Sequence, residues 1–370
     1  MRVVLHEWCC SGGLRTPEAA GLFGDAGGVQ AGLPVEGRAM LAALLCDGVR
    51  ADDLEFTLLL DAAADMPLPE KRDRVTVIRV PEGEERRCLA EAAATADWTL
   101  IVAPETDGIL ADRVAVARAA GGNVAAADGR FITLAADKQA TVIALAGAGV
   151  AVPAGCLLPA GGRLPDPFRR PAVAKALDSC GGEGLVVVPR GALLPPAPLP
   201  RRVEAFVPGV PVGVSCLCGP AEMIVLPPVR QRFSAGNHPT YLGGDLRLGS
   251  PLRDRAMALA RRAIRGLESA QRRARGWVGV DMILGDREDG VGDRVLEVNP
   301  RMTTSFVGLC SLGKASLLRA MLAVAAGEGC LWPGAETGGD GSFTVDGGLV
   351  GPEAFEPGEN DEGIDGRRAR

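Results

Sequence analysis

The stretch that most constrains the fold of this chain is 277–306. Two strand-like runs, 277–284 and 294–299, flank nine residues that are rich in Gly and acidic side chains. This pattern predicts a β-hairpin, because two such runs joined by turn-forming residues pair in antiparallel fashion. If pairing begins where the loop closes, Leu284 faces Arg294, and that register then fixes every other pair.

The predicted register places two carboxylates opposite each other, Asp281 and Glu297, with Asn299 on the same side of its strand. Opposed carboxylates, with roughly 5 Å between their β-carbons, destabilise a hairpin unless a positive charge lies between them. A divalent cation bound by hard oxygen ligands supplies that charge, and Gly279 leaves space beside it. The alternative is a solvated acidic sheet face. The apolar opposite face and the fixed cation of Arg301 favour a cation site.

The composition narrows the class of protein. With 370 residues the chain is long enough for two or three packed units. It has no apolar run of about 18 residues and no signal-peptide core, so we expect a cytoplasmic protein with no membrane partner. Ten Cys without a C-x-x-C pair fit a reducing compartment, and only two His argue against histidine-based chemistry. The net charge of −6 comes from 333–370, and the rest of the chain has equal numbers of acidic and basic residues. It therefore has no overall positive charge that would favour a nucleic-acid partner.

Residues 1–127 alternate short apolar strands with helical patterns, which predicts a small parallel α/β domain. Its first strand, 3–6, leads into the loop 7–14, at the strand end where ligands bind in open α/β sheets. The loop lacks G-x-G-x-x-G, so dinucleotide binding is poorly supported and a plain turn is an equal alternative. We expect this loop, Tyr241 and the segment 301–308 to form the substrate pocket.

Lysine is rare in this chain, because Arg supplies most of its 40 basic residues. Lys138 opens a predicted helix, and Lys175 lies near the end of a predicted strand. The loop that follows contains Gly181, Gly182 and Gly184, and such a loop lets backbone amides approach phosphate oxygens. A Lys just before it is a suitable phosphate partner. The alternative is that these lysines were retained by chance. The glycine cluster alone is weak evidence, because the chain has 50 Gly.

Five sequence elements occur in this order: D-K-x-x-T at 137–141, the strand with Lys175, the Gly-rich loop 181–184, the hinge segment 204–207, and V-D-M…L-E-V-N-P-R at 280–301. Together they make the chain resemble the ATP-grasp superfamily of carboxylate–amine ligases, over about residues 1–328. In detail, S-G-G-L at 11–14 and N-P-R-x-T-T-S at 299–305 resemble the tyramine–glutamate ligase branch, which acts in methanofuran-type cofactor synthesis.

The resemblance implies a fold of the α/β and α+β class with ATP-grasp architecture. It implies an N-terminal parallel α/β domain (1–127), a central α+β subdomain with the lysines and the Gly-rich loop (128–204), and a C-terminal antiparallel-sheet α+β subdomain with the metal site (205–330). Residues 331–370 are rich in Gly, Pro and acidic side chains, and we predict a disordered tail there.

The resemblance also implies an activity and a set of residues. The cofactors are ATP and Mg²⁺ or Mn²⁺, the substrates are a small carboxylate and an amine, and the amide bond forms through an acyl phosphate. The oligomeric state stays open, with a homodimer as one option. The implied residues are the metal ligands Asp281, Glu297 and Asn299; the ATP-contacting Lys138 and Lys175; the loop glycines Gly181, Gly182 and Gly184; the adenine hinge Glu204, Ala205, Phe206 and Val207; and the catalytic residues Arg301 and Lys175.

Two positions depart from the family's pattern. Pro211 stands where many relatives have the acid that holds ribose, which leaves this role to Glu204 or another group. Gly279 stands where some amino-acid ligases have an Arg, and Arg230 or Arg232 is a candidate substitute. Three alternatives stay open: another ATP-grasp amino-acid or peptide ligase, a non-catalytic ATP-binding protein, and a dinucleotide oxidoreductase.

Overall fold

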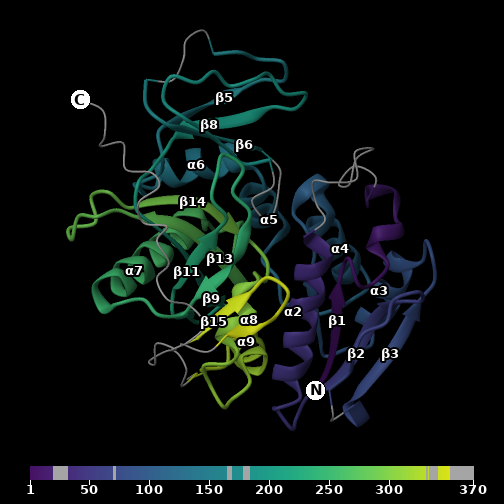
Figure 1. The fold of residues 1–370 in the computed structure, drawn as a ribbon. Coiled ribbons are helices and arrows are strands. Elements are labelled where there is room, and N and C mark those ends of the chain that lie inside the picture. The colour runs from purple at the N-terminus through teal and green to yellow at the C-terminus, as the bar shows by residue number, and fades with distance from the viewer. Residues whose placement is uncertain are drawn as a thin grey trace.

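The computed structural model describes residues 1–19, 32–69, 72–164, 169–177, 184–330, 332 and 341–350. Within them the chain combines a parallel α/β unit with two antiparallel sheets. Figure 1 shows the parallel unit on the right, the largest sheet to its left and the smallest sheet at the top. The predicted α/β and α+β fold class is confirmed.

The N-terminal sheet has four parallel strands, β1 (Arg2–Glu7), β2 (Glu55–Asp61), β3 (Val75–Val80) and β4 (Trp98–Val102), in the order β3-β2-β1-β4. Val3 and Leu5 pack in one core cluster with α2, whereas Val4 packs in another cluster with α3 and α4. Helices therefore cover both faces, as buried parallel strands require. The helices are η1 (Gly13–Arg15), α2 (Leu33–Gly48), η2 (Arg72–Arg74), α3 (Glu85–Ala93), η3 (Thr106–Gly108) and α4 (Ile109–Ala119).

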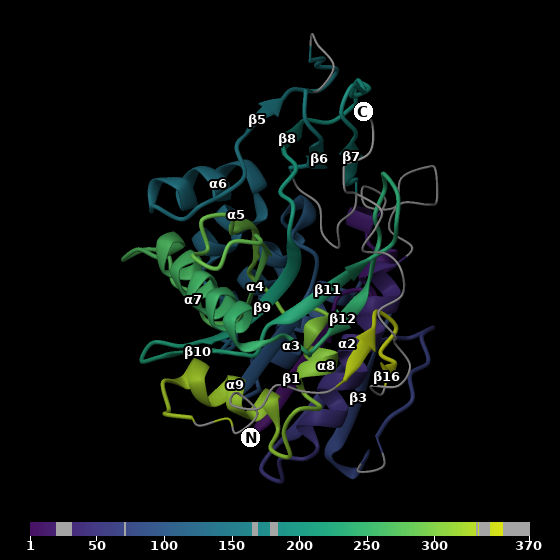
Figure 2. The ribbon, with the colours of Figure 1, turned by 60° about the vertical axis from the view of Figure 1, so that its left-hand side comes forward.

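The small sheet is antiparallel, in the order β5-β8-β6-β7, and has a core cluster of its own. Figure 2 shows it extending away from the largest sheet. Lys175 lies near the end of β6 and Glu204 near the end of β8, so this sheet holds two predicted site residues in adjacent strands. Its strands are β5 (Gly155–Leu158), β6 (Ala172–Ala176), β7 (Val186–Val188) and β8 (Arg201–Ala205).

The largest sheet is antiparallel and has eight strands among the described residues. They are β9 (Val210–Cys218), β10 (Met223–Val225), β11 (Val229–Phe233), β12 (Tyr241–Asp245), β13 (Gly276–Leu284), β14 (Arg294–Asn299), β15 (Ser342–Thr344) and β16 (Leu349–Val350), in the order β14-β13-β9-β11-β12-β15-β16, with β10 beside β9.

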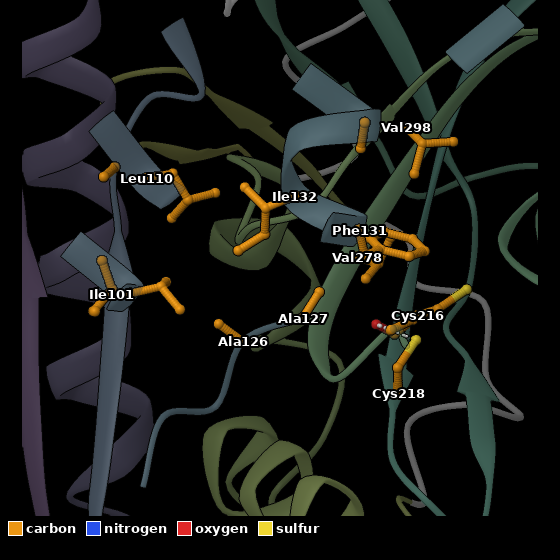
Figure 3. Packing of buried hydrophobic residues seen from close by; sticks show 14 of the residues in the cluster. Ile101, Leu110, Ala126, Ala127, Phe131, Ile132, Cys216, Cys218, Val278 and Val298 are labelled. Atoms are coloured by element: carbon orange, nitrogen blue, oxygen red, sulfur yellow. Dashed lines mark hydrogen bonds between the residues drawn. The ribbon is translucent and has the colours of Figure 1, made fainter. Parts of the chain in front are cut away.

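One face of the largest sheet packs against helices α5 (Gly129–Ala136), α6 (Lys138–Gly147) and α7 (Ser250–Leu267). Figure 3 shows this core continuing into the N-terminal domain: Ile101 and Leu110 lie in the same cluster as Phe131 of α5 and as Val278 and Val298 of the sheet. Helices α8 (Ser305–Leu309) and α9 (Leu317–Ala326) pack against α2. Among the described residues no helix is both long enough and apolar enough to cross a membrane.

The register of the β13–β14 hairpin agrees with the prediction at the carboxylate pair and differs from it near the loop. Asp281 pairs with Glu297, as expected. The predicted Leu284–Arg294 pair is wrong, because Ile283 lies opposite Arg294. The register shifts after Asp281, where Leu296 is an extra residue on β14. A β-bulge of this kind inserts one residue into one strand and cannot be read from the loop length.

The predicted structureless tail is wrong for residues 341–350, which form β15 and β16 and pair with β12. Phe343 is only 1% exposed. A β-carbon at Gly308 would lie 2.3 Å from its ring, and one at Gly244 would lie 2.9 Å away, so two glycines make room for it. Phe343 is the single aromatic residue that fixes this segment to the sheet, which explains why the composition of the tail did not predict the two strands. Residues 331, 333–340 and 351–370 lie outside the described part of the chain.

A buried cap joins the N-terminal domain to the C-terminal helices. Asp47 of α2 accepts hydrogen bonds from Ser316 Oγ at 2.8 Å, Leu317 N at 3.1 Å and Leu318 N at 2.8 Å, and it pairs with Arg50. These donors begin α9, so one carboxylate caps that helix and ties it to α2.

We expect Asp47→Ala to lower the free energy of unfolding by about 3 kcal/mol, because several buried donors lose their acceptor together. Urea unfolding followed by circular dichroism measures this. Asp53→Ala is the matched control, since Asp53 is half exposed and pairs with Arg319 at 2.9 Å on the surface, and its loss should cost less than about 1 kcal/mol. Equal losses for the two variants would contradict the capping role of Asp47.

Candidate active site

A cleft that opens to solvent lies on the face of the largest sheet opposite α7. Strand alternation produces it: Val212 and Val214 of β9 pack toward α7, so Gly213 and Ser215 face the cleft. The tertiary structure brings six of the predicted site residues to this cleft: Lys138, Lys175, Asp281, Glu297, Asn299 and Arg301.

One of the two opposed carboxylates, Asp281, is held by two side-chain amides. Gln231 Nε2 donates to Asp281 Oδ1 at 2.8 Å, and Asn299 Nδ2 donates to Asp281 Oδ2 at 2.8 Å. Burial and the neighbouring charge of Glu297 nevertheless raise the pKa of Asp281 to about 7. The like-charge conflict expected from the sequence is therefore present in the folded protein, and two neutral amides do not relieve it.

The wall beside this pair is lined with hydroxyl groups. Ser305 Oγ lies 2.7 Å from Thr303 Oγ1 and 2.9 Å from Ser215 Oγ. Gly279 lines the cleft, and a β-carbon there would lie only 2.7 Å from Thr303 Cγ2. Part of the space that the sequence assigned to Gly279 is thus taken by Thr303.

Both predicted lysines are buried beside the opposed carboxylates, and Lys138 forms an ion pair with one of them. Lys138 is the first residue of α6, which Asp137 caps, and its Nζ lies 3.5 Å from Glu297 Oε2. Burial opposes ionisation of Glu297, but the charges of Lys138 and Lys175 outweigh it and lower the pKa of Glu297. Lys175 Nζ also donates to the carbonyl of Leu296 at 3.4 Å. The bulge residue of β14 thus turns its backbone oxygen toward a lysine of the small sheet.

The predicted adenine hinge, Glu204–Val207, borders Lys175 but does not line the cleft. Glu204 is buried, and its carboxylate pairs with Lys175 Nζ at 2.7 Å and with Arg202 Nε at 2.9 Å. The amide N–H groups of Ala205 and Phe206 donate to the carbonyls of Ala154 and Pro171. Two cations therefore already engage the carboxylate that the sequence offered as a ribose ligand.

The structure describes only part of the predicted phosphate-binding loop, and it places neither candidate for the missing arginine, Arg230 or Arg232, in the cleft. Gly181 and Gly182 lie outside the described residues, whereas Gly184 is described and has a positive φ of 66°. Neither Arg230 nor Arg232 lines the cleft, because alternation along β11 points Gln231, the residue between them, at Asp281.

The N-terminal domain contributes Glu36 to the lining of the cleft and Glu105 as a partner of Arg301, and the sequence singled out neither residue. Glu105 Oε2 accepts a hydrogen bond from Arg301 Nε at 2.8 Å, and Glu36 Oε2 accepts one from Thr304 Oγ1 at 2.8 Å. Tyr241 lines the cleft, as expected, but the loop 7–14 does not. No local pattern marks Glu36 or Glu105, since only long-range packing brings them to the segment after β14.

Comparison with known proteins identifies this architecture. A family model described as an ATP-grasp domain matches residues 135–305, and one described as a pre ATP-grasp 3 domain matches residues 54–126. The chain therefore has an ATP-grasp domain preceded by a pre-ATP-grasp domain. No curated protein matches the sequence.

Solved structures share the fold at low identity. A putative ATP-grasp superfamily protein from Archaeoglobus fulgidus is 21% identical, with a TM-score of 0.62 over 89% of this chain and 88% of that one. An L-amino acid ligase from Bacillus licheniformis is 14% identical, with a TM-score of 0.55 over 92% and 78%. N5-carboxyaminoimidazole ribonucleotide synthetase from Thermotoga maritima is 15% identical, with a TM-score of 0.54 over 90% and 77%. The domain match and the shared fold of these neighbours agree with the predicted ATP-grasp architecture.

Proposed function

We propose that this protein is an ATP-dependent carboxylate–amine ligase, which forms an amide bond through an acyl phosphate. The observation that carries the proposal is the convergence in one cleft of two buried lysines, one arginine and two opposed carboxylates. That arrangement suits a reaction in which phosphate charge must be bound and then redistributed, and it needs no side-chain nucleophile.

Binding of the triphosphate falls to the cations of the cleft. Lys138 and Lys175 are compact ammonium groups in buried surroundings, where a charge interacts strongly with a phosphate oxygen. Each lysine has an acidic partner: Lys138 Nζ lies 3.5 Å from Glu297 Oε2, and Lys175 Nζ lies 2.7 Å from Glu204 Oε1. Closure of the Gly-rich loop over the phosphates stays a prediction, because 181–183 lie outside the described residues.

The donor set fits a magnesium ion. Asp281, Glu297 and Asn299 offer only hard oxygen ligands, and the raised pKa of Asp281 records a charge conflict that a cation would relieve. No group of three or more His, Cys, Asp or Glu side chains in the described ranges could hold a metal by itself. Mg²⁺ characteristically binds through one or two carboxylates together with substrate phosphates. When bound here it would neutralise phosphate charge.

The proposed reaction has two steps. An oxygen of the substrate carboxylate attacks the γ-phosphorus of ATP, the bond to the bridging oxygen breaks, and ADP leaves. The nitrogen of an amine then attacks the acyl carbon and expels phosphate. Arg301, held in place by Glu105, would bind the phosphate and acyl-phosphate oxygens in both steps. A closed cleft would exclude the water that hydrolyses an acyl phosphate.

For the substrates, we propose L-glutamate as the carboxylate and tyramine or a related aromatic amine as the nucleophile. The support is the S-G-G-L and N-P-R-x-T-T-S resemblance to tyramine–glutamate ligases. The cleft adds an aromatic wall, since the rings of Phe233 and Tyr241 lie 5.7 Å apart and both line it.

We expect ADP release from Mg²⁺-ATP to require both glutamate and an amine. A coupled assay with L-glutamate and a panel of amines that includes tyramine and tyrosine measures this. Release with other amino-acid pairs but not with glutamate would keep the ligase and reject the substrates. Tight ATP binding without ADP release in any mixture would instead favour a non-catalytic nucleotide-binding protein.

A further inference from the structure

Two carboxylates of the N-terminal domain meet the segment 301–304, and they differ in what they bind. Glu105 forms an ion pair with Arg301 at 2.8 Å. Glu36, near the start of α2, accepts a hydrogen bond from the hydroxyl of Thr304 at 2.8 Å. Across the described part of the chain, no Lys or Arg lies within ion-pairing distance of Glu36. Among the described residues, Glu105 thus has an ion-pairing partner, whereas Glu36 has a hydroxyl donor and only the more distant charge of Arg301.

The surroundings of Glu36 favour a positively charged ligand. Burial raises its pKa, and the hydrogen bond from Thr304 and the charge of Arg301 offset this only in part. Tyr241 lies on the same cleft, and burial likewise raises the pKa of its hydroxyl, which keeps that group neutral. A carboxylate that is partly removed from water without a cation beside it destabilises the folded protein. A ligand that carries a cation into the cleft would recover this energy.

The position of Glu36 indicates which group that cation belongs to. Glu36, Thr304 and Arg301 line the same cleft as the carboxylate pair, so a small molecule whose reacting carboxylate lies beside Arg301 can place a second group at Glu36. The attacking amine must be neutral, whereas a carboxylate partner favours the charged ammonium form. The ammonium that Glu36 favours is therefore not the nucleophile.

Resting on the proposed ligase function, we propose that Glu36 binds the ammonium group of the carboxylate substrate, with Thr304 as a second acceptor. The molecule that is phosphorylated is then an amino acid and not a plain carboxylic acid. Glu36 acts as a specificity-determining residue, and the phosphoryl transfer itself does not involve it.

The test compares amino acids with their deamino acids, such as L-glutamate with glutarate, across the set of common L-amino acids. ADP release is measured with Mg²⁺-ATP and the amine panel for the wild type, for Glu36→Gln, and for Glu91→Gln, a matched control on an exposed face of the same domain. We expect the wild type to favour one amino acid over its deamino partner about 10- to 100-fold, since an ion-paired hydrogen bond is lost with the ammonium.

In Glu36→Gln the KM of that amino acid should rise about 10- to 100-fold, while kcat and the use of the deamino acid stay near the wild-type values. Thr304→Val should raise the same KM less, and Glu91→Gln should change nothing. Thermal unfolding of Glu36→Gln should show a melting temperature at or above that of the wild type, which separates this effect from misfolding.

Three results would overturn the inference. A wild type that uses deamino acids as well as amino acids would leave the ligase intact and remove the ammonium subsite. A fall in kcat with an unchanged KM in Glu36→Gln would make Glu36 a participant in the chemistry. Absence of ADP release with every acid would reject the proposed ligase function, and the inference with it.

Discussion

Glu297→Gln should abolish turnover while the protein stays folded. We expect ADP release to fall about 1,000-fold or more, because Glu297 is both the proposed metal ligand and the ion-pair partner of Lys138, and the substitution removes the charge that both roles need. The same substitution removes one of two opposed carboxylates, whose repulsion raises the pKa of Asp281. The loss of the ion pair with Lys138 opposes this gain, so the melting temperature should change little.

The matched control is Glu288→Gln, an exposed carboxylate in the loop of the same hairpin, which should behave as the wild type in both assays. Titration with Mg²⁺ adds a second readout, since Glu297→Gln should need a higher concentration for any residual activity. Near-normal ADP release by Glu297→Gln would make this residue a surface charge and remove the metal site. A lower melting temperature would show that the pair stabilises the apoprotein.

Truncation of the chain after residue 340 should destabilise the protein, whereas truncation after residue 350 should not. The first removes β15, which pairs with β12 and buries Phe343 against Gly244 and Gly308. Phe343→Ala alone should cost about 3–5 kcal/mol of unfolding free energy, the usual range for a buried phenylalanine. Because β12 carries Tyr241 into the cleft, the shorter chain should also bind substrate more weakly.

Denaturant unfolding of both truncated chains and of Phe343→Ala measures the effect. Leu349→Ala is the matched control, since this residue of β16 is 61% exposed, and its loss should cost less than about 0.5 kcal/mol. Unchanged stability after truncation at 340 would return residues 341–350 to the passive tail that composition predicts. A loss on truncation at 350 would show that 351–370 contribute to the fold.

Much of the candidate site could be predicted because its residues are close in sequence or lie on regular elements. The pairing of Asp281 with Glu297 follows from strand alternation within one hairpin, and it survives a β-bulge that shifts the rest of the register. The two lysines stand out against a background of arginine, and each lies on a recognisable helix or strand. Order along the chain then indicated the superfamily.

Other parts of the site depend on contacts that no local pattern encodes. Gln231 and Asp281 meet only because β11 and β13 flank β9 in the folded sheet. The pairing of Glu204 with Lys175 requires β6 and β8 to be neighbours, and it takes up the group that the sequence offered to ribose. The Leu284–Arg294 pair was predicted wrongly because of the bulge at Leu296. One inserted residue does not change the hydrophobic alternation of so short a strand enough to be recognised.

The sequence by itself determined the opposed carboxylates, since short-range spacing dictates which side chains share a face. The fold class and the accompanying lysines followed from the order of motifs that resembles the ATP-grasp superfamily. Only the tertiary structure decided which groups complete the cleft. Glu36 and Glu105 arrive there from the N-terminal domain, and Phe343 returns from a polar tail to extend the sheet. Each of these contacts joins residues far apart in the chain, and each is fixed by the packing of whole elements rather than by the residues next to it.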